Sequence, residues 1–287
     1  MILKKLLLAL GVIIVLIVIA LQQLGVFAVF FPSHQHEVDP PVLPEMQASS
    51  TVLLFTKTNS FRHVDGIEAG VELMKTLATK NAWQIFHTEN GAVFNPQQLA
   101  KFKAVIFLNS SGDNLSIDQQ RAFQHWLENG GGWLGVHAAG DGSHKDWPWY
   151  LENLIGADFT AHIMGPQFQQ AKMINENPDH PVMGDLKGHW LHTEEWYSWA
   201  QSPRGKGFDI LAVVDEDSYQ PYVKIFGSET DLRMGDHPVV WSRCVKQGRA
   251  IYSALGHGAE AYQAAEHQAL LESAVNWILA PQKPECR

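Results

Sequence analysis

The segment GGGWLGVHAAGDG, which runs from Gly130 to Gly142, decides the fold. A short apolar strand, Gly131 to Val136, leads into His137, and a turn rich in glycine and alanine follows. Such small residues remove the side chains that would block a sharp turn between a strand and a helix. Enzymes use a turn of this kind to present a nucleophile at the carboxyl end of a central strand. His137 occupies that tip here, where it can act as a base, an acid or a metal ligand.

Apolar runs and amphipathic segments alternate around this turn. The predicted elements are strands at 51–55, 82–87, 103–108 and 131–136, and helices at 64–80, 96–102 and 116–129. Ser116 is a good N-cap for the last of these helices. Strict alternation predicts an α/β fold with a doubly wound, mostly parallel, flavodoxin-like sheet. Because ligands bind beyond the carboxyl ends of such strands, segments 56–63, 109–114 and 137–144 are expected to share one rim.

The pattern changes after residue 155. Strand-like segments at 169–175, 191–199, 210–214 and 223–226 predict an inserted antiparallel β extension. Two further strands, 238–245 and 249–255, return to the main sheet, and a helix over 259–279 closes the domain.

The N-terminal segment is strongly apolar. An unbroken apolar run extends from Leu6 to Leu21, with two lysines before it and two glutamines after it. A helix from residue 3 to about residue 27 would span about 30 Å of hydrocarbon, so we expect a single transmembrane helix. A cleaved signal peptide is the rival interpretation, but no clear cleavage site follows the run. The lysines predict a cytoplasmic N-terminus and a domain on the periplasmic or extracellular side.

The predicted organisation is an anchor or signal peptide at 1–31, a proline-rich extended linker at 32–50, one domain at 51–280 and a tail at 281–287. Subtracting the charge of Lys4 and Lys5 from the formal net charge of −9 leaves −11 for the rest of the chain. Such an acidic chain is not expected to bind nucleic acid. The two cysteines, Cys244 and Cys286, are too few for a disulfide framework. We expect Cys244 to be a small core residue rather than half of a disulfide bond.

Several segments, taken in order, match one family. They are SFRH at 60–63, the turn at 132–140, GADFTAH at 156–162, DHP at 179–181, TEEWY at 193–197, HPVVW at 237–241 and GRAIYSALGH at 248–257. Together they resemble the ThuA-like (trehalose utilisation) domain family, and the resemblance covers Val52 to Leu279. That family is similar in fold to class I glutamine amidotransferases, which carry a catalytic cysteine at the matching turn. Because His137 stands there, amidotransferase chemistry is not expected. The resemblance implies a role in carbohydrate metabolism, on keto-sugar derivatives of disaccharides.

Four residues are candidates for catalysis: His137, His63, Glu195 and His257. His63 follows the first strand and so faces the same rim as His137. Glu195 lies in an aromatic segment, where desolvation would raise its pKa and suit a general acid or base. His257, with Glu260 one turn later, is expected to open the last helix and to orient or protonate His137. Plain structural roles, such as helix capping or loop hydrogen bonds, remain the alternative for each.

Three residues are candidates for binding the substrate: Arg62, His162 and Tyr197. The guanidinium of Arg62 could hold a carboxylate or several sugar hydroxyls, and a surface ion pair with Asp65 is its alternative role. If 191–199 is one strand, Tyr197 shares a face with Glu195.

No cofactor is certain, but a divalent, zinc-like metal is an open alternative. Its ligands would be His63, His137, His162 and Glu195. No pair of them has the spacing of an H-E-x-x-H motif, so their convergence would depend on the fold.

The expected function is enzymatic: glycosidic cleavage, or a related proton transfer, on an oxidised (keto) sugar by histidine and glutamate acid–base chemistry. In that scheme His137 or His63 takes a proton, Glu195 gives one, and Arg62 holds the substrate. A small carbohydrate and, through the N-terminal helix, a membrane are the expected partners. Two alternatives stay open: a non-catalytic saccharide-binding or sensing module, and a metal-dependent hydrolase of a non-sugar substrate.

Overall fold

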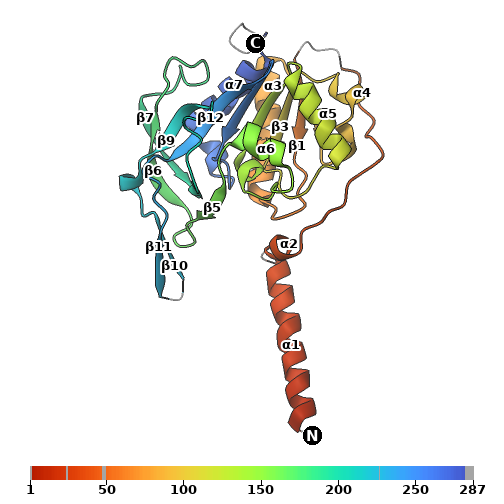
Figure 1. The fold of residues 1–287 in the computed structure, drawn as a ribbon, viewed down its shortest axis with the longest axis vertical. Coiled ribbons are helices and arrows are strands. Elements are labelled where there is room, and N and C mark those ends of the chain that lie inside the picture. The colour runs from red at the N-terminus through yellow and green to blue at the C-terminus, as the bar shows by residue number, and fades with distance from the viewer. Residues whose placement is uncertain (1, 24, 47–49, 226, 282–287) are drawn as a thin grey trace.

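A nine-stranded sheet forms the centre of the molecule in the computed structural model, which describes residues 2–23, 25–46, 50–225 and 227–281 (Figure 1). The strand order is β2-β1-β3-β4-β13-β12-β9-β6-β7. Its strands are β1 (Thr51–Phe55), β2 (Gln84–Thr88), β3 (Ala104–Leu108), β4 (Gly132–Val136), β6 (Gln169–Asn175), β7 (His189–Glu194), β9 (Asp209–Val214), β12 (Pro238–Val245) and β13 (Gly248–Ser253).

One half of this sheet is parallel. Strands β2, β1, β3, β4 and β13 run in the same direction. Every residue of β1, β3 and β4 is buried, as expected for parallel strands that are covered on both faces. Because the strands are parallel, the segments after β1, β3, β4 and β13 all emerge at one rim of the sheet.

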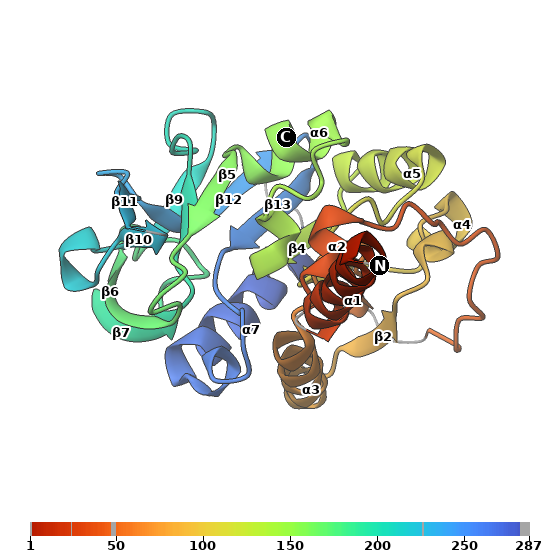
Figure 2. The same ribbon diagram turned by 90° about the horizontal axis from the view of Figure 1, so that it is seen from below.

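Helices cover both faces of the parallel half. Figure 2 shows α3 and α7 on one face and α5 and α6 on the other. The helices are α1 (Ile2–Gln23), α2 (Phe27–Phe30), α3 (Val64–Asn81), α4 (Pro96–Leu99), α5 (Ile117–Glu128), α6 (Pro148–Tyr150) and α7 (Ala265–Leu279), with short 3-10 or π turns η1 (Gly91–Val93), η2 (His137–Gly140), η3 (Leu151–Ile155), η4 (Glu216–Ser218) and η5 (Ala261–Gln263). Helix α5 begins with the predicted cap: the Ser116 hydroxyl accepts from Gln119 N, and the Gln119 side chain accepts from Ser116 N.

The antiparallel strands continue the main sheet instead of forming a separate layer. Strand β12 pairs with β13 in antiparallel fashion, and β9, β6 and β7 follow outward. The sheet is therefore mixed, half parallel and half antiparallel, rather than mostly parallel. Two small sheets lie outside it: β5 (Phe159–His162) pairs with β8 (Tyr197–Trp199), and β10 (Tyr222–Ile225) pairs with β11 (Ser228–Asp231).

The prediction of an N-terminal transmembrane helix is wrong. Among the helices within the described residues, none is both long and apolar enough to cross a membrane. Helix α1 ends at Gln23, and residues 27–30 form the separate turn α2, so no single helix reaches residue 27. The uncharged apolar run from Leu6 to Leu21 gives only about 24 Å at 1.5 Å per residue. The location of the domain outside the cytoplasm was inferred from this helix, and the structure does not test it.

Two further expectations need revision. The closing helix begins at Ala265, and the segment before it forms the separate turn η5. Cys244, on β12, is disulfide-bonded rather than a free core thiol. The other cysteine of the sequence, Cys286, lies outside the described residues, as does the predicted tail from residue 282 onward.

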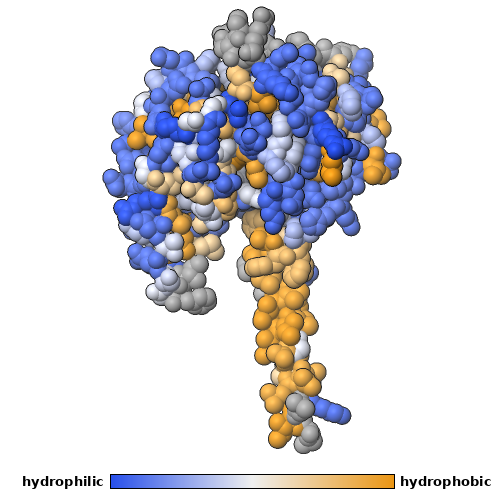
Figure 3. Space-filling view, in the orientation of Figure 1, coloured by the Kyte–Doolittle hydropathy of each residue, from blue (hydrophilic) through white to orange (hydrophobic). Residues whose placement is uncertain are grey.

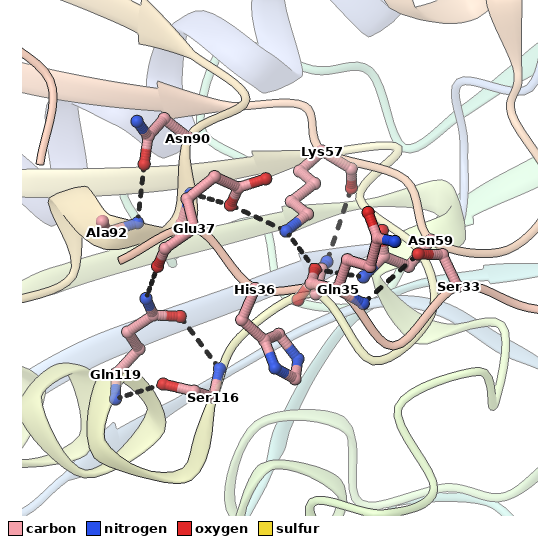
Figure 4. A network of polar contacts seen from close by, with 12 residues as sticks. Ser33, Gln35, His36, Glu37, Lys57, Asn59, Asn90, Ala92, Ser116 and Gln119 are labelled. Atoms are coloured by element: carbon pink, nitrogen blue, oxygen red, sulfur yellow. Dashed lines mark hydrogen bonds and ion pairs between the residues drawn. The ribbon is translucent and has the colours of Figure 1, made fainter. Parts of the chain in front are cut away.

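The predicted linker lies along the domain as a hydrogen-bonded strap, which we define as residues 32–46 (Figure 4). Glu37 of the strap accepts from the ammonium of Lys57 at 2.7 Å and from Gly91 N at 2.8 Å. The same ammonium donates to Gln35 O at 2.8 Å, which satisfies the buried Lys57 side chain. Side chains of α4, α5 and β2 bind strap carbonyls farther along, as Gln119 does with Glu37 O. The surface is mostly hydrophilic on the face of the domain seen in Figure 3, and α1 projects from it.

Candidate active site

A pocket of about 930 Å³ opens where the parallel strands end. His63 follows β1 and immediately precedes α3, and His137 is the first residue after β4. His257 lies in the loop after β13. The inserted region supplies Glu195 between β7 and β8, and His162 at the end of β5. These five side chains, from five different segments, come together with Tyr197 on β8. All of them line the pocket except His137, which is fully buried.

His137 is held in one orientation and one tautomer. Its Nδ1 donates to the carbonyl of Ala254 at 2.8 Å, so Nδ1 carries the hydrogen and Nε2 carries a lone pair. Nε2 lies 2.8 Å from the hydroxyl of Tyr197 and 3.2 Å from Nδ1 of His257. Burial lowers the pKa of His137 to about 4, so the ring is neutral at neutral pH.

Glu195 contacts three of the four histidines of the cluster. One carboxylate oxygen, Oε1, lies 3.0 Å from Nδ1 of His162 and accepts from Gln167 at 2.5 Å. The other oxygen, Oε2, lies 3.0 Å from Nδ1 of His257 and 3.6 Å from Nε2 of His137. Burial acts to raise the pKa of Glu195, but the hydrogen bonds from His162 and His257 outweigh it and hold the pKa far below its ordinary value. The expectation of a raised pKa was therefore wrong, and Glu195 is an anion rather than a proton donor.

The pKa of His162 is shifted in the opposite direction to that of His137. Its Nδ1 also approaches the carbonyl of Ile163 at 3.2 Å, so this atom carries the hydrogen that is donated to Glu195. Burial acts to lower the pKa of His162, but the hydrogen bond and charge of Glu195 raise it above its ordinary value. The side chain keeps 28% of its surface exposed and lines the pocket. Its Nε2 is thus the ring atom able to exchange a proton with a bound molecule.

His63 packs between the other two histidines. Its ring centre lies 4.7 Å from that of His137 and 4.5 Å from that of His257. Its Nδ1 is buried and has no hydrogen-bond partner among the described residues. Burial and the neighbouring imidazoles lower the pKa of His63 well below its ordinary value. One donor atom from each of His63, His137, His257 and Glu195 can be chosen so that all four lie within 4.8 Å of one another, a grouping that could hold a metal ion.

Two predicted participants stay outside this cluster. The guanidinium of Arg62 binds Glu89 at 2.7 Å and Thr58 at 3.2 Å, and Arg62 is absent from the lining of the pocket. It forms a surface ion pair, although with Glu89 rather than with Asp65. Glu260 is exposed and lies before the start of α7, so it does not extend the cluster. The other predicted residues all converge, although Tyr197 directs its hydroxyl to His137.

Sequence reasoning missed two carboxylates at this site. Glu194 is buried and accepts from the backbone N–H groups of Gly256, at 2.6 Å, and His257, at 3.3 Å, so it fixes the loop that carries His257. The family resemblance pointed to Glu195 rather than to Glu194. In the structure β7 ends at Glu194 and the chain turns before β8, so both carboxylates reach the loop of His257. Asp141 lines the pocket, and burial raises its pKa to about 6. Its position four residues after His137, in the same turn, could have identified Asp141 as a site residue from the sequence.

Comparison with known proteins agrees with this architecture. The family model described as "ThuA: Trehalose utilisation" matches residues 51–278. A ThuA-like protein from Bacteroides uniformis is similar at 26% identity and a TM-score of 0.70, over 85% of this chain and 97% of that one. A ThuA-like protein from Parabacteroides merdae shares the fold at 17% identity and a TM-score of 0.63, over 80% of this chain and 90% of that one. No curated protein matches this chain.

Proposed function

The chain belongs to the ThuA (trehalose utilisation) family, and from this premise we propose that it is an enzyme that transfers a proton on a carbohydrate bound in the pocket beside Glu195. The family relates the chain to carbohydrate utilisation, and the pocket supplies the chemistry. The observation that carries the proposal is the pairing of Glu195 with His162 at 3.0 Å at the pocket wall.

This pair has the properties of a proton-transfer dyad. A buried carboxylate bound to one ring nitrogen fixes the tautomer of a histidine and stabilises its protonated form. Glu195 does this for His162, whose pKa is raised. His137, a few ångströms away, is kept neutral by burial. Environments that drive the pKa values of neighbouring groups apart are characteristic of acid–base sites. We therefore assign proton transfer to His162, where the sequence had suggested Glu195 as the acid.

The pocket suits a mono- or disaccharide. Its volume of about 930 Å³ is at the upper end of the range for small-molecule sites, about 300–1,000 Å³. Phe61, Phe159 and Tyr197 offer aromatic surface for the apolar faces of sugar rings, while Asp141 and Gln167 offer hydrogen-bonding groups. The mixture of aromatic and polar lining is what a polyol with apolar ring faces requires.

A keto sugar fits this chemistry best. A carbonyl group acidifies the neighbouring C–H bond, so Nε2 of His162, in its neutral form, can remove that proton as the base and then holds it. The electron pair then forms a C=C bond as the C–O bond to the leaving sugar breaks, and the leaving oxygen takes up the proton held by His162. Addition of water to the resulting enone completes a net glycosidic cleavage. Developing charge on the carbonyl oxygen would be stabilised by the cluster of His63, His137 and His257.

The test uses the purified chain with native and 3-keto disaccharides in D₂O, followed by NMR. We expect deuterium to enter the position next to the carbonyl and free sugar to appear, with the keto substrate only. In His162→Gln both rates should fall by about 10²–10⁴-fold, the usual contribution of a general acid or base. His125→Gln, which changes an exposed histidine on α5, is the matched control and should leave both rates unchanged.

Saccharide binding without exchange or product, under all these conditions, would contradict catalysis and favour a binding or sensing module. Full activity in His162→Gln would refute the assignment of the proton to this residue.

A further inference from the structure

The geometry points to a divalent metal site, of the kind that zinc occupies, formed by His63, His137, His257 and Oε2 of Glu195. The role of the ion in the reaction rests on the proposed function, whereas the binding of the ion does not depend on it. All four residues can place one donor atom within 4.8 Å of the other three.

The separations of the donor atoms match a metal site. Nε2 of His137 lies 3.2 Å from Nδ1 of His257, and Oε2 of Glu195 lies 3.6 Å from the former nitrogen and 3.0 Å from the latter. An ion with bonds of about 2.0–2.1 Å in tetrahedral geometry holds its ligand atoms about 3.3 Å apart. The three atoms thus already form one face of such a tetrahedron, and His63 packs against both other rings to supply the fourth ligand.

Two ring nitrogens have features that a bound ion would explain. The lone pair of His137 Nε2 is directed into the cluster because Nδ1 is bound to Ala254 O, and such an outer hydrogen bond is typical of metal-binding histidines. Nδ1 of His63 is buried without a hydrogen-bond partner among the described residues. An unsatisfied buried nitrogen in a crowded polar cluster needs an explanation, and an ion that is bound by the imidazole would provide one.

The charge and the ligand types select the ion. Three imidazoles and one carboxylate carry one negative charge, which favours a dication. Imidazole-rich sets of four suit zinc and similar transition metals better than magnesium or calcium, which prefer oxygen ligands. The buried carboxylate of Glu194 stands behind His257 and holds its loop through the two backbone N–H groups. At the pocket wall such an ion would polarise the carbonyl oxygen of a keto sugar.

A substitution of Tyr197 distinguishes a metal site from a hydrogen-bond network that only holds His137 in place. Its hydroxyl donates to Nε2 of His137 at 2.8 Å, so an ion that binds this nitrogen must displace the hydrogen bond. Tyr197→Phe is therefore expected to bind the ion as tightly as the wild type, or more tightly. A network whose purpose is only to hold His137 predicts no ion binding in either protein.

The experiment titrates chelator-stripped protein with Zn²⁺ by calorimetry and with Co²⁺ by visible absorption. We expect one saturable ion per chain and a Co²⁺ spectrum typical of four nitrogen and oxygen ligands. His63→Gln and His257→Gln should each weaken binding by more than about 100-fold, because the loss of outer hydrogen bonds alone costs about 10–100-fold. His125→Gln is the control and should bind as the wild type does, and circular dichroism checks that each variant is folded.

No saturable uptake by the wild type, or equal uptake by a His63→Gln/His257→Gln double variant, would overturn the metal site. Saturable binding without turnover of keto sugars would support the site and contradict the proposed function. Turnover by chelator-stripped protein that takes up no ion would support the proposed function and overturn the site.

Discussion

His137 shows how a single residue changes the chemistry of this fold. Its φ of 50° lies in the left-handed region, which most side chains disfavour, so the turn presents the ring at some cost in backbone strain. Tyr252 supports the turn by donating to the carbonyl of His137 at 2.8 Å. The ring is then fixed by Ala254 and Tyr197, and this leaves a buried, neutral imidazole at the tip of the turn.

Asp141 makes stability depend on pH. Its pKa is raised to about 6 in the folded protein, against about 3.9 in an unfolded chain. Between these values the folded state keeps a proton that the unfolded state has lost, so raising the pH through this window destabilises the folded state. We predict that Asp141→Asn gains stability relative to the wild type as the pH rises from 4 to 7. Urea unfolding at several pH values measures this, and a constant difference between the two proteins would contradict it.

The sequence predicted some site residues better than others, for a physical reason. His63, His137 and His257 each follow a parallel strand, and such positions must meet at the carboxyl rim. Glu195 and His162 come from the inserted region, whose placement depends on tertiary pairing that no local pattern encodes. The sign of the pKa shift of Glu195 was wrong because its imidazole neighbours, rather than its aromatic ones, dominate.

At the scale of elements, a break between two strands creates the site. Residues 191–199 were predicted as one strand-like segment, but β7 ends at Glu194 in the large sheet and β8 begins at Tyr197 in the small sheet with β5. This change of sheet turns Glu194 and Glu195 toward the same histidine loop. Alternating burial could not reveal it, because β8 is buried throughout.

The turn after β4 depends on close packing at Gly140. A Cβ atom there would lie 2.4 Å from Cζ of Tyr252, and Tyr252 is buried and holds the backbone of His137. We predict that Gly140→Ala lowers the free energy of unfolding by about 1–3 kcal/mol, as overpacking does, and reduces turnover. Gly188→Ala is the control, since its Cβ would meet nothing within 4 Å. Equal stability of both variants would show that Tyr252 can move away freely.

At the scale of the molecule, the N-terminal segment is part of the domain surface and of the pocket. The strap is hydrogen-bonded to Lys57 after β1, to β2, and to α4 and α5. Val26, Val29 and Pro32 contribute to the pocket wall. The linker was predicted from its prolines to be a spacer, but composition does not show the buried Lys57 with which Glu37 pairs. The strands of the parallel half of the main sheet, by contrast, could be predicted, because short apolar runs and amphipathic segments alternate along the chain.

The ion pair of the strap can be tested by substitution. Glu37→Gln leaves Lys57 buried without a compensating charge, so we predict a loss of about 1–3 kcal/mol in the free energy of unfolding. The double variant Glu37→Gln/Lys57→Met removes both charges and should recover part of that loss. Chemical denaturation measures both. A double variant less stable than Glu37→Gln alone would mean that Lys57 is stabilised by its bond to Gln35 O instead.

Removal of residues 1–31 tests the pocket wall. The strap remains, so we predict a change of less than about 1 kcal/mol in stability. The affinity for a bound keto disaccharide should fall several-fold, because Val26 and Val29 leave the pocket lining. Calorimetric titration of both chain lengths gives the affinities, and an unchanged value would show that the sugar does not reach this wall.

The central claim is that the carboxylate of Glu195 organises a working proton-transfer centre, and Glu195→Gln tests it most directly because the two side chains have nearly the same shape. The measurement is the rate of deuterium incorporation and product formation from a 3-keto disaccharide in D₂O. We predict a fall of at least about 100-fold in a variant that remains folded and still binds the sugar. A Glu195→Gln variant that works at the rate of the wild type would contradict the claim.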